Sequence, residues 1–253
     1  MTKVFVSQQA VDGGQVYLSG DDARHLGLVL RKKPGDKVVI CIDGQSFVGR
    51  IEHVEAECVR VSLHQSMGSN QESPIHIRLY QGLAKGDKFE LVIQKATELG
   101  VNEIIPYTSK HTVVKLDQKR KKSRLTRWQK IANEAGKQCK RDQIPVITDL
   151  LDFSSVIKQL SSGNRDTLVL MPYEQASEEK KLPLDKSPME VAILIGPEGG
   201  FHADEVEAVK QIGGQIISLG PRILRTETAG LITVAIVQFL WGDLGVSKGL
   251  KLE

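Results

Sequence analysis

Two nearly continuous apolar runs in the C-terminal half of this chain constrain its fold more than any other feature. Residues 167–171 read TLVLM and residues 191–195 read VAILI, without the polar alternation of half-exposed strands. Continuous apolar strands are typical of parallel sheets that are buried on both faces. Because helices must cover both faces, the runs predict an α/β fold with a mainly parallel sheet.

Strand-like and helix-like segments alternate from residue 75 onward, as repeated βα units require. We expect strands at residues 75–81, 101–107, 144–147, 167–171, 191–195 and 215–219. We expect helices at residues 87–99, 125–138, 153–160, 203–212 and 226–241. Asp87 and Glu90 have the spacing of a capping box at the start of the first of these helices.

The N-terminal part of the chain has the pattern of an all-β domain. Residues 38–42 (VVICI) precede Asp43-Gly44, a pair that favours a two-residue hairpin turn, and residues 58–63 supply another short strand. A small barrel buries such strands without long open edges. Because residues 64–73 are polar and rich in turn formers, we expect a β-barrel domain at residues 1–72 and an α/β domain at residues 73–253.

Composition excludes several classes of protein. No run of eighteen apolar residues is present, which argues against a membrane span, and the first eleven residues lack the order of a signal peptide. We therefore expect a cytoplasmic protein. The three cysteines form no CxxC pair, so neither a disulfide framework nor a zinc site is expected.

Positive charge is concentrated in one segment, although the net charge is only +3. Residues 117–141 hold ten basic residues and two acidic ones. Such a run binds polyanions, because each neutralised phosphate releases condensed counterions. A solvated helical face is the alternative interpretation.

Two loops that follow expected strands combine glycines with charged residues. The first reads IGPEGGF at residues 195–201, and the second reads LGPRILRTETA at residues 219–229. Ligands of open α/β sheets bind at the carboxyl ends of the strands, where both loops lie. Neither loop has the spacing of a Walker A or GxGxxG motif, and without GxSxG or HExxH there is no support for nucleophilic hydrolysis or zinc chemistry. Tight turns and a helix cap at Thr226 are the structural alternatives.

The same two loops closely resemble those of the SPOUT-class 16S ribosomal RNA uracil-N3 methyltransferases. Segments 85–101 (KGDKFELVIQKATELGV) and 134–147 (EAGKQCKRDQIPVI) resemble the middle of that family. Segment 25–36 (HLGLVLRKKPGD) resembles its N-terminal RNA-binding domain. The resemblance runs in order through nearly the whole chain.

Membership would imply an N-terminal PUA-like β-barrel, a C-terminal SPOUT domain with a deep trefoil knot, and a homodimer. It would also imply S-adenosylmethionine as the cofactor and 16S ribosomal RNA, or the small ribosomal subunit, as the partner. The implied reaction is methylation of N3 of a specific uridine. The implied cofactor contacts are Met171, Ile195, Gly196, Pro197, Glu198, Gly199, Gly200, Leu219, Gly220, Ile223 and Leu224.

Methylation at uracil N3 requires loss of the imide proton, which suggests roles for three charged residues. A cation such as Arg225 would stabilise the developing anion, and Glu227 or Glu198 would accept the proton. Alternatively, Arg225 and Glu227 pair with each other and only shape the loop. Candidate RNA contacts in the barrel and the basic segment are Arg24, Arg31, Lys119, Arg120, Lys121, Lys122, Arg124, Arg127 and Arg141.

This sequence departs from the family pattern at two positions. His111 stands where the family usually has an arginine, and His202 stands where a threonine or serine often caps a helix, although Glu205 keeps the capping-box position. Neither departure lies in the two cofactor loops. Two other functions remain open: a non-catalytic RNA-binding or ribosome-assembly protein, and a SPOUT methyltransferase that acts on another RNA.

Overall fold

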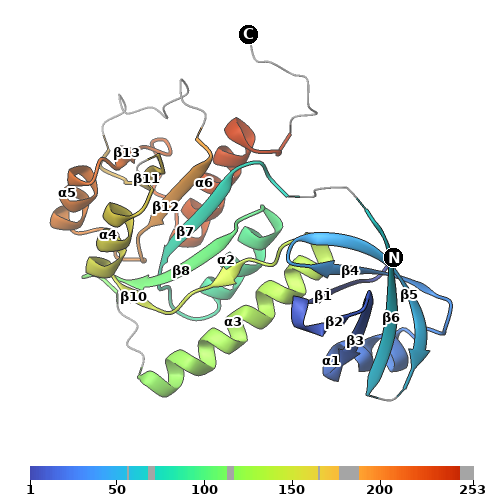
Figure 1. The fold of residues 1–253 in the computed structure, drawn as a ribbon. Helices are drawn as coiled ribbons and strands as arrows, with labels where there is room; N and C mark the ends of the chain where they lie inside the picture. The colour runs from blue at the N-terminus through green and yellow to red at the C-terminus, as the bar shows by residue number, and fades with distance from the viewer. Residues whose placement is uncertain (56, 68–71, 113–116, 165, 177–187, 246–253) are drawn as a thin grey trace, which may run out of the picture. The chain divides into compact units, whose positions relative to one another are not determined.

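The computed structural model describes residues 1–55, 57–67, 72–112, 117–164, 166–176 and 188–245. The chain forms two compact units (Figure 1). Unit 1 consists of Met1–Glu72 and Lys137–Gln143, and unit 2 consists of Ser73–Gly136 and Ile144–Glu253. The segment at residues 64–73, where we expect the domain boundary, lies partly outside the described residues.

Unit 1 is built on a curled six-stranded sheet in the order β1-β4-β5-β6-β3-β2 (Figure 1). Its strands are β1 (Lys3–Val6), β2 (Val11–Asp12), β3 (Gln15–Ser19), β4 (Lys37–Ile42), β5 (Gln45–Val54) and β6 (Cys58–Ser66). Its short helical segments are η1 (Gln8–Ala10), α1 (Gly20–Arg24) and η2 (His25–Val29). Asp43 (φ 46°) and Gly44 (φ 83°) form the turn between β4 and β5, which confirms the predicted hairpin.

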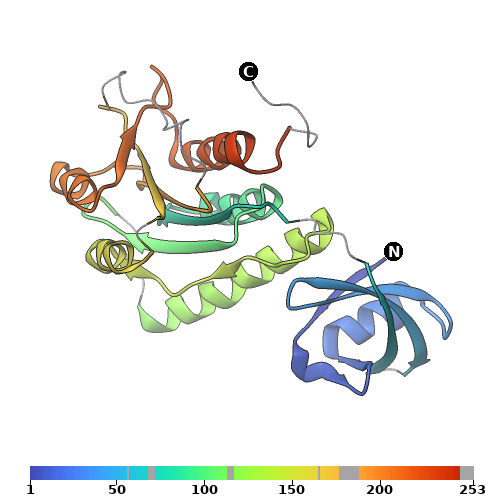
Figure 2. The same cartoon turned by 45° about the horizontal axis from the view of Figure 1, so that its top comes forward.

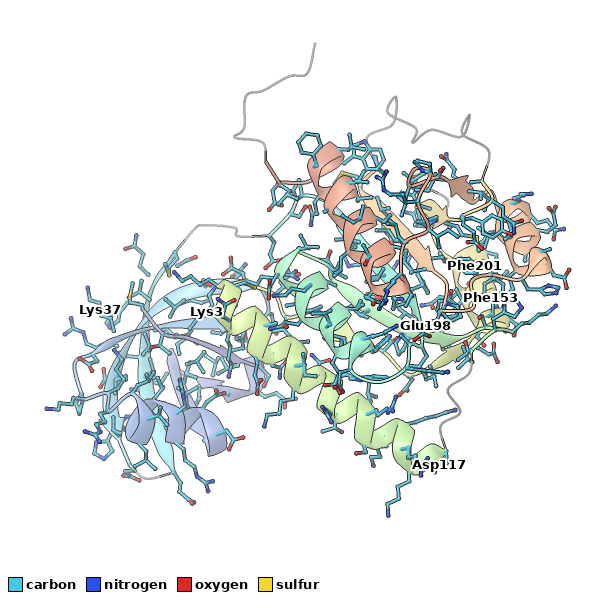
Figure 3. The ribbon with its side chains drawn as sticks, turned by 180° about the vertical axis from the view of Figure 1, so that it is seen from behind. Lys3, Lys37, Asp117, Phe153, Glu198 and Phe201 are labelled. Carbon is cyan, nitrogen blue, oxygen red and sulfur yellow. The ribbon has the colours of Figure 1, made fainter. Side chains whose placement is uncertain are left out.

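The segment Lys137–Gln143 is anchored in unit 1 by buried charges. Arg141 and Glu72 form an ion pair at 2.5 Å with side chains only 5% and 6% exposed. The Glu72 carboxylate also accepts the N–H groups of Asp142 and Gln143 at 2.8 and 2.9 Å. Lys3, labelled in Figure 3, places its Nζ 2.6 Å from the Asp142 carboxylate. Because each buried charge has an opposite partner, the segment can be held without an uncompensated ion.

Unit 2 contains a seven-stranded sheet in which every recorded pairing is parallel. The strand order is β10-β8-β7-β12-β11-β13, and β9 pairs with β8. The strands are β7 (His76–Gly82), β8 (Glu103–Thr108), β9 (Val146–Ile147), β10 (Leu151–Asp152), β11 (Leu168–Pro172), β12 (Glu190–Ile195) and β13 (Gln215–Ile217). The parallel α/β fold predicted from the sequence is confirmed.

Two hydrophobic clusters explain the continuous apolar runs. In β12, Ile193 belongs to the cluster that includes Phe89 and Val234, whereas Ala192 and Leu194 belong to the cluster on the other face. Alternate residues of the strand therefore bury against different layers. Helices lie on both sides of the sheet (Figure 2). They are α2 (Lys88–Glu98), α3 (Gln118–Cys139), α4 (Phe153–Ser162), α5 (Ala203–Gln211) and α6 (Thr226–Trp241).

Helix α3 differs from the prediction, because it begins at Gln118 rather than near residue 125. The basic run is therefore part of the helix. The predicted capping box of α2 is wrong: the Asp87 side chain makes no capping hydrogen bond, and Glu90 binds Arg127 at 2.7 Å instead. An ion pair between two helices has replaced the local contact that the spacing suggested.

Strand order alone does not fix the path of the chain through a knot, so the trefoil knot stays a prediction. None of the helices in the described ranges is both long enough and apolar enough to span a membrane.

Candidate active site

The two glycine-containing loops lie together at the carboxyl edge of the sheet in unit 2, where they border a cavity of about 420 Å³. The loop after β12 contributes one wall and carries Glu198 and Phe201, both labelled in Figure 3. The start of α6 and the residues before it form another wall of the cavity. The lining residues are Lys88, Pro172, Glu174, Ile195, Gly196, Pro197, Glu198, Gly199, Gly200, Phe201, Ile223, Leu224, Arg225, Thr226 and Ala229.

Glycine is required in the first loop because neighbouring groups approach its backbone closely. A Cβ on Gly196 would lie 3.1 Å from the Phe201 ring, and one on Gly199 would lie 2.8 Å from the Cβ of His111. Gly200 has a φ of 69°, a conformation that other residues rarely adopt. The loop is therefore tightly packed and presents main chain to the cavity.

Gly82, at the end of β7, packs directly against the main chain of this loop, a role that the sequence pattern did not reveal. A Cβ on Gly82 would lie 2.5 Å from the nitrogen of Pro197 and 2.7 Å from the carbonyl carbon of Gly196. The pairing of β7 with β12 brings these atoms together, with Gln81 opposite Ile195. Only a residue without a side chain fits between the strand end and the loop.

A buried polar chain ties the two loops together. Gln81 is fully buried and donates from Nε2 to the Thr226 hydroxyl at 2.8 Å. The Thr226 hydroxyl donates to the carbonyl of Gly196 at 2.5 Å. Thr226 is thus the first residue of α6 and links the two loops, rather than acting as the helix cap, a position that Arg225 occupies. Neither Gln81 nor this role of Thr226 was predicted.

Three ionisable groups meet next to the cavity, and two of them, Lys88 and Glu198, line it. The Lys88 ammonium lies 3.6 Å from Oε1 of Glu198 and 3.9 Å from Oε2 of Glu227. Burial acts to raise the pKa of Glu198, but the N–H of Lys85 at 2.9 Å and the Lys88 charge outweigh it, so the pKa lies below its ordinary value. Among the described residues, Oε2 of Glu227 is buried without a hydrogen-bond partner.

Arg225 presents a free cation to the cavity. Its side chain is exposed, and within the described ranges it has no recorded hydrogen bond or ion pair, including none to Glu227. The structure therefore favours the interpretation in which Arg225 is available to a ligand over the one in which it pairs with Glu227. The second cation of the site, Lys88, was not singled out from the sequence.

Most of the predicted cofactor contacts line the cavity. Those that do not are Met171, Leu219 and Gly220, and the predicted catalytic Glu227 is also absent from the lining. Met171 is fully buried in β11, next to the lining residue Pro172. The lining residues missed from the sequence are Lys88, Pro172, Glu174, Phe201, Thr226 and Ala229.

His111 and His202 lie beside each other. The rings of His111 and His202 are 5.8 Å apart, and His111 also packs against Gly199. His202 caps α5, because its Nδ1 accepts the N–H of Asp204 at 3.3 Å, while Glu205 accepts the N–H of His202 at 2.9 Å. The capping box of this helix thus forms with a histidine in place of threonine or serine.

The candidate RNA contacts divide into accessible and inaccessible residues. Arg24, Arg31, Lys119, Arg120, Lys122 and Arg127 are exposed, and Lys121 and Arg124 are partly buried. Arg24 is paired with Glu57 at 3.3 Å, and Arg127 with Glu90. Arg141 requires a correction: its guanidinium is buried against Glu72, so the structure argues against a direct RNA contact.

Comparison with known proteins identifies the family. Residues 71–238 match the model of an RNA methyltransferase domain, and residues 18–61 match that of an RNA methyltransferase PUA domain. The chain belongs to the RNA methyltransferase family. This confirms the membership that the paired loop motifs predicted and the PUA-like character of the N-terminal part.

Two curated relatives of this RNA methyltransferase are similar over nearly their whole length. The ribosomal RNA small subunit methyltransferase E of Bacillus subtilis (strain 168) is 33% identical over 243 residues, covering 92% of this chain and 93% of the relative. The protein of the same name from Buchnera aphidicola subsp. Acyrthosiphon pisum (strain APS) is 31% identical, covering 92% and 91%.

Solved structures agree with this assignment. The crystal structure of a ribosomal RNA small subunit methyltransferase E from Neisseria gonorrhoeae bound to S-adenosyl methionine has a TM-score of 0.84 and 29% identity, covering 96% of this methyltransferase and 99% of that chain. A methyltransferase from Legionella pneumophila in complex with the bound cofactor SAM has a TM-score of 0.83 and 31% identity, with the same coverage.

Proposed function

We propose that this chain transfers a methyl group from S-adenosylmethionine to N3 of a uridine in the RNA of the small ribosomal subunit. The observation that carries the proposal is that both family loops wall one and the same cavity, with Arg225 at its border and two carboxylates close by. The names of the relatives support the cofactor and the class of RNA. Because the proposed substrate is ribosomal RNA, we expect the protein to act in the cytoplasm.

The residues around the cavity fit the proposed cofactor. A volume of about 420 Å³ is in the range of small-molecule sites. Ile195, Ile223 and Leu224 supply apolar surface for an adenine ring, and the glycine-rich loop supplies main-chain hydrogen-bond groups. When bound, S-adenosylmethionine supplies a methyl group that its sulfonium already activates. The protein must then mainly align the base and exclude water.

The charged residues have complementary roles in this proposal. Arg225 stabilises the negative charge that develops on the uracil oxygens as the N3 proton leaves. Glu198 lines the cavity but is a weak base, because its pKa is lowered. We therefore assign the proton to Glu227, whose carboxylate lies beside Lys88 next to the cavity, with one water as the relay from the base.

Helix α3 and the PUA-like domain are the proposed RNA-binding elements. Lys119, Arg120 and Lys122 lie exposed on α3, which begins just after Asp117 (Figure 3). Phosphate contacts from these side chains would position the RNA, while the cavity selects the base.

Charge reversal at Lys119 and Lys122 together is expected to weaken RNA binding and to lower the slope of log affinity against log salt by about 2, since each lost phosphate contact removes roughly one released counterion. Fluorescence anisotropy at several salt concentrations measures both quantities. The matched control reverses Lys95 on α2 and Lys210 on α5. Each of these lysines pairs with a glutamate of its own helix, Glu98 and Glu207 respectively. An equal loss in the control would remove α3 from the interface.

A second copy of the chain is the proposed partner of α6. Ile232 and Phe239 leave 43% and 46% of their surface exposed on this helix, and Ile223 before it leaves 85%. Exposed apolar side chains grouped on one element mark association surfaces. Sedimentation velocity of the purified chain measures whether it is the expected homodimer.

The proposed function is tested by mapping methylated nucleotides in 16S ribosomal RNA from cells with and without the protein. We expect one 3-methyluridine to be lost with the gene and restored by the purified chain and S-adenosylmethionine. Heat of binding to the cofactor, without methyl transfer, would favour a non-catalytic RNA-binding or assembly role. A methyl group on another RNA would favour the alternative SPOUT substrate.

A further inference from the structure

The Lys88 ammonium lies within ion-pair distance of the carboxylates of Glu198 and Glu227, and Lys88 also lines the cavity. It is the first residue of α2, whereas Glu198 follows β12 and Glu227 lies in the first turn of α6. Three segments far apart in the sequence thus place one ammonium between two carboxylates. The side chains are 35% (Lys88), 30% (Glu198) and 14% (Glu227) exposed, so water screens the three charges only in part.

We propose that Lys88 is a positioning residue that allows Glu198 and Glu227 to remain ionised together beside the cavity. This inference rests on the proposed function, in which Glu227 accepts the proton from the base. Two neighbouring carboxylates repel each other, and without a cation one of them takes up a proton more readily. A protonated Glu227 cannot act as the acceptor. Lys88 therefore extends to lower pH the range in which Glu227 is ionised and can accept the proton.

The contact distances fit this role. At 3.6 and 3.9 Å the ammonium is within ion-pair range of both oxygens but is beyond an ordinary hydrogen bond to either. Glu198 has the N–H of Lys85 as a second partner, whereas Oε2 of Glu227 has no hydrogen-bond partner among the described residues. Lys88 is thus the closest recorded positive charge for the buried oxygen of Glu227.

The other charged groups around the cavity are Arg225, from the loop before α6, and Glu174, which follows β11. Within the described ranges Arg225 forms no recorded ion pair with Glu198 or Glu227, and Glu174 is itself a carboxylate and offers them no positive charge. Loss of the Lys88 charge would therefore leave the two carboxylates without their shared partner. The pKa of each should rise, because a nearby opposite charge is what favours the ionised form.

The test compares Lys88→Met, which keeps most of the length of the side chain without its charge, with Lys88→Arg. We expect the acid limb of the kcat–pH profile to move to higher pH by about one unit in Lys88→Met and to return in Lys88→Arg. In cofactor-free Lys88→Met, the side-chain carboxyl ¹³C signals of Glu198 and Glu227 should titrate at higher pH than in the cofactor-free wild-type protein. The glutamine variants of the two residues assign these signals. Lys95→Met, on the same helix but paired with Glu98, is the control for folding and charge.

A lower rate with unmoved carboxyl titrations would overturn the proposal, because Lys88 would then act on the substrate directly. A large loss of cofactor affinity in both Lys88 variants would also overturn it in favour of a cofactor contact. The titrations can be measured whether or not the protein methylates RNA. If the wild-type chain transfers no methyl group, the proposed function fails, whereas unmoved titrations in Lys88→Met refute only the role of Lys88.

Discussion

Replacement of Arg225 by alanine is expected to lower methyl transfer by about 10²–10³-fold while leaving the affinity for S-adenosylmethionine nearly unchanged. Arg225 lines the cavity and is not neutralised by any recorded ion pair in the described part of the chain. Its charge is therefore available for the anion that forms when uracil loses its N3 proton. Such an interaction is stronger in the transition state than in the ground state, so its loss lowers kcat.

Single-turnover kinetics with saturating cofactor and RNA measure this step, and calorimetry measures cofactor binding. Arg222→Ala is the matched control, because Arg222 is an exposed arginine of the same loop that does not line the cavity. Unchanged turnover in Arg225→Ala would refute the proposed role. An equal loss in Arg222→Ala would show that the loop needs its total charge rather than a cation at one position.

The substitution Gly82→Ala is expected to weaken cofactor binding and to lower methyl transfer by about 100-fold, since a misplacement of about 1 Å costs roughly that factor in rate. The new methyl group would meet the main chain of Gly196 and Pro197 at 2.7 and 2.5 Å. Main-chain atoms cannot rotate away as the end of a flexible side chain can. The loop after β12 must therefore move, which displaces the cavity wall that the loop forms.

Calorimetric titration with S-adenosylmethionine, together with thermal unfolding, separates the local effect from global destabilisation. Gly86→Ala is the control in the next turn, where a Cβ would meet nothing within 4 Å and only the positive φ of 61° opposes it. That strain costs roughly 1–2 kcal/mol of stability and leaves the cavity unaltered. Wild-type affinity in Gly82→Ala would contradict the close approach described here.

The sheet could be predicted from the sequence because burial of a strand on both faces leaves a direct record in composition. Ile193 and Leu194 are both apolar since they face different helical layers, as the two clusters confirm. Helix ends were harder to predict. The sequence could not indicate that Glu90 would bind Arg127 on another helix instead of capping its own, because the competing partner is far away along the chain.

The candidate site was predictable only as far as its residues lie in the two loops. Glycines after buried strands indicate where a ligand can approach, and the loop motifs indicated the family that the comparisons confirm. Gln81, Gly82 and Lys88 carry no such local signal. Their proximity to Thr226, Pro197 and Glu198 arises because β7 pairs with β12 in the middle of the sheet.

The sequence by itself determined the alternation of buried strands and helices, the hairpin at Asp43-Gly44 and the two loops at the carboxyl edge. Each of these depends on the polarity or backbone freedom of neighbouring residues. The tertiary structure alone decided that Lys88 would lie between Glu198 and Glu227, and that Arg141 would be buried against Glu72. Coulomb attraction and steric fit depend on distance in space, which strand order sets and residue spacing does not.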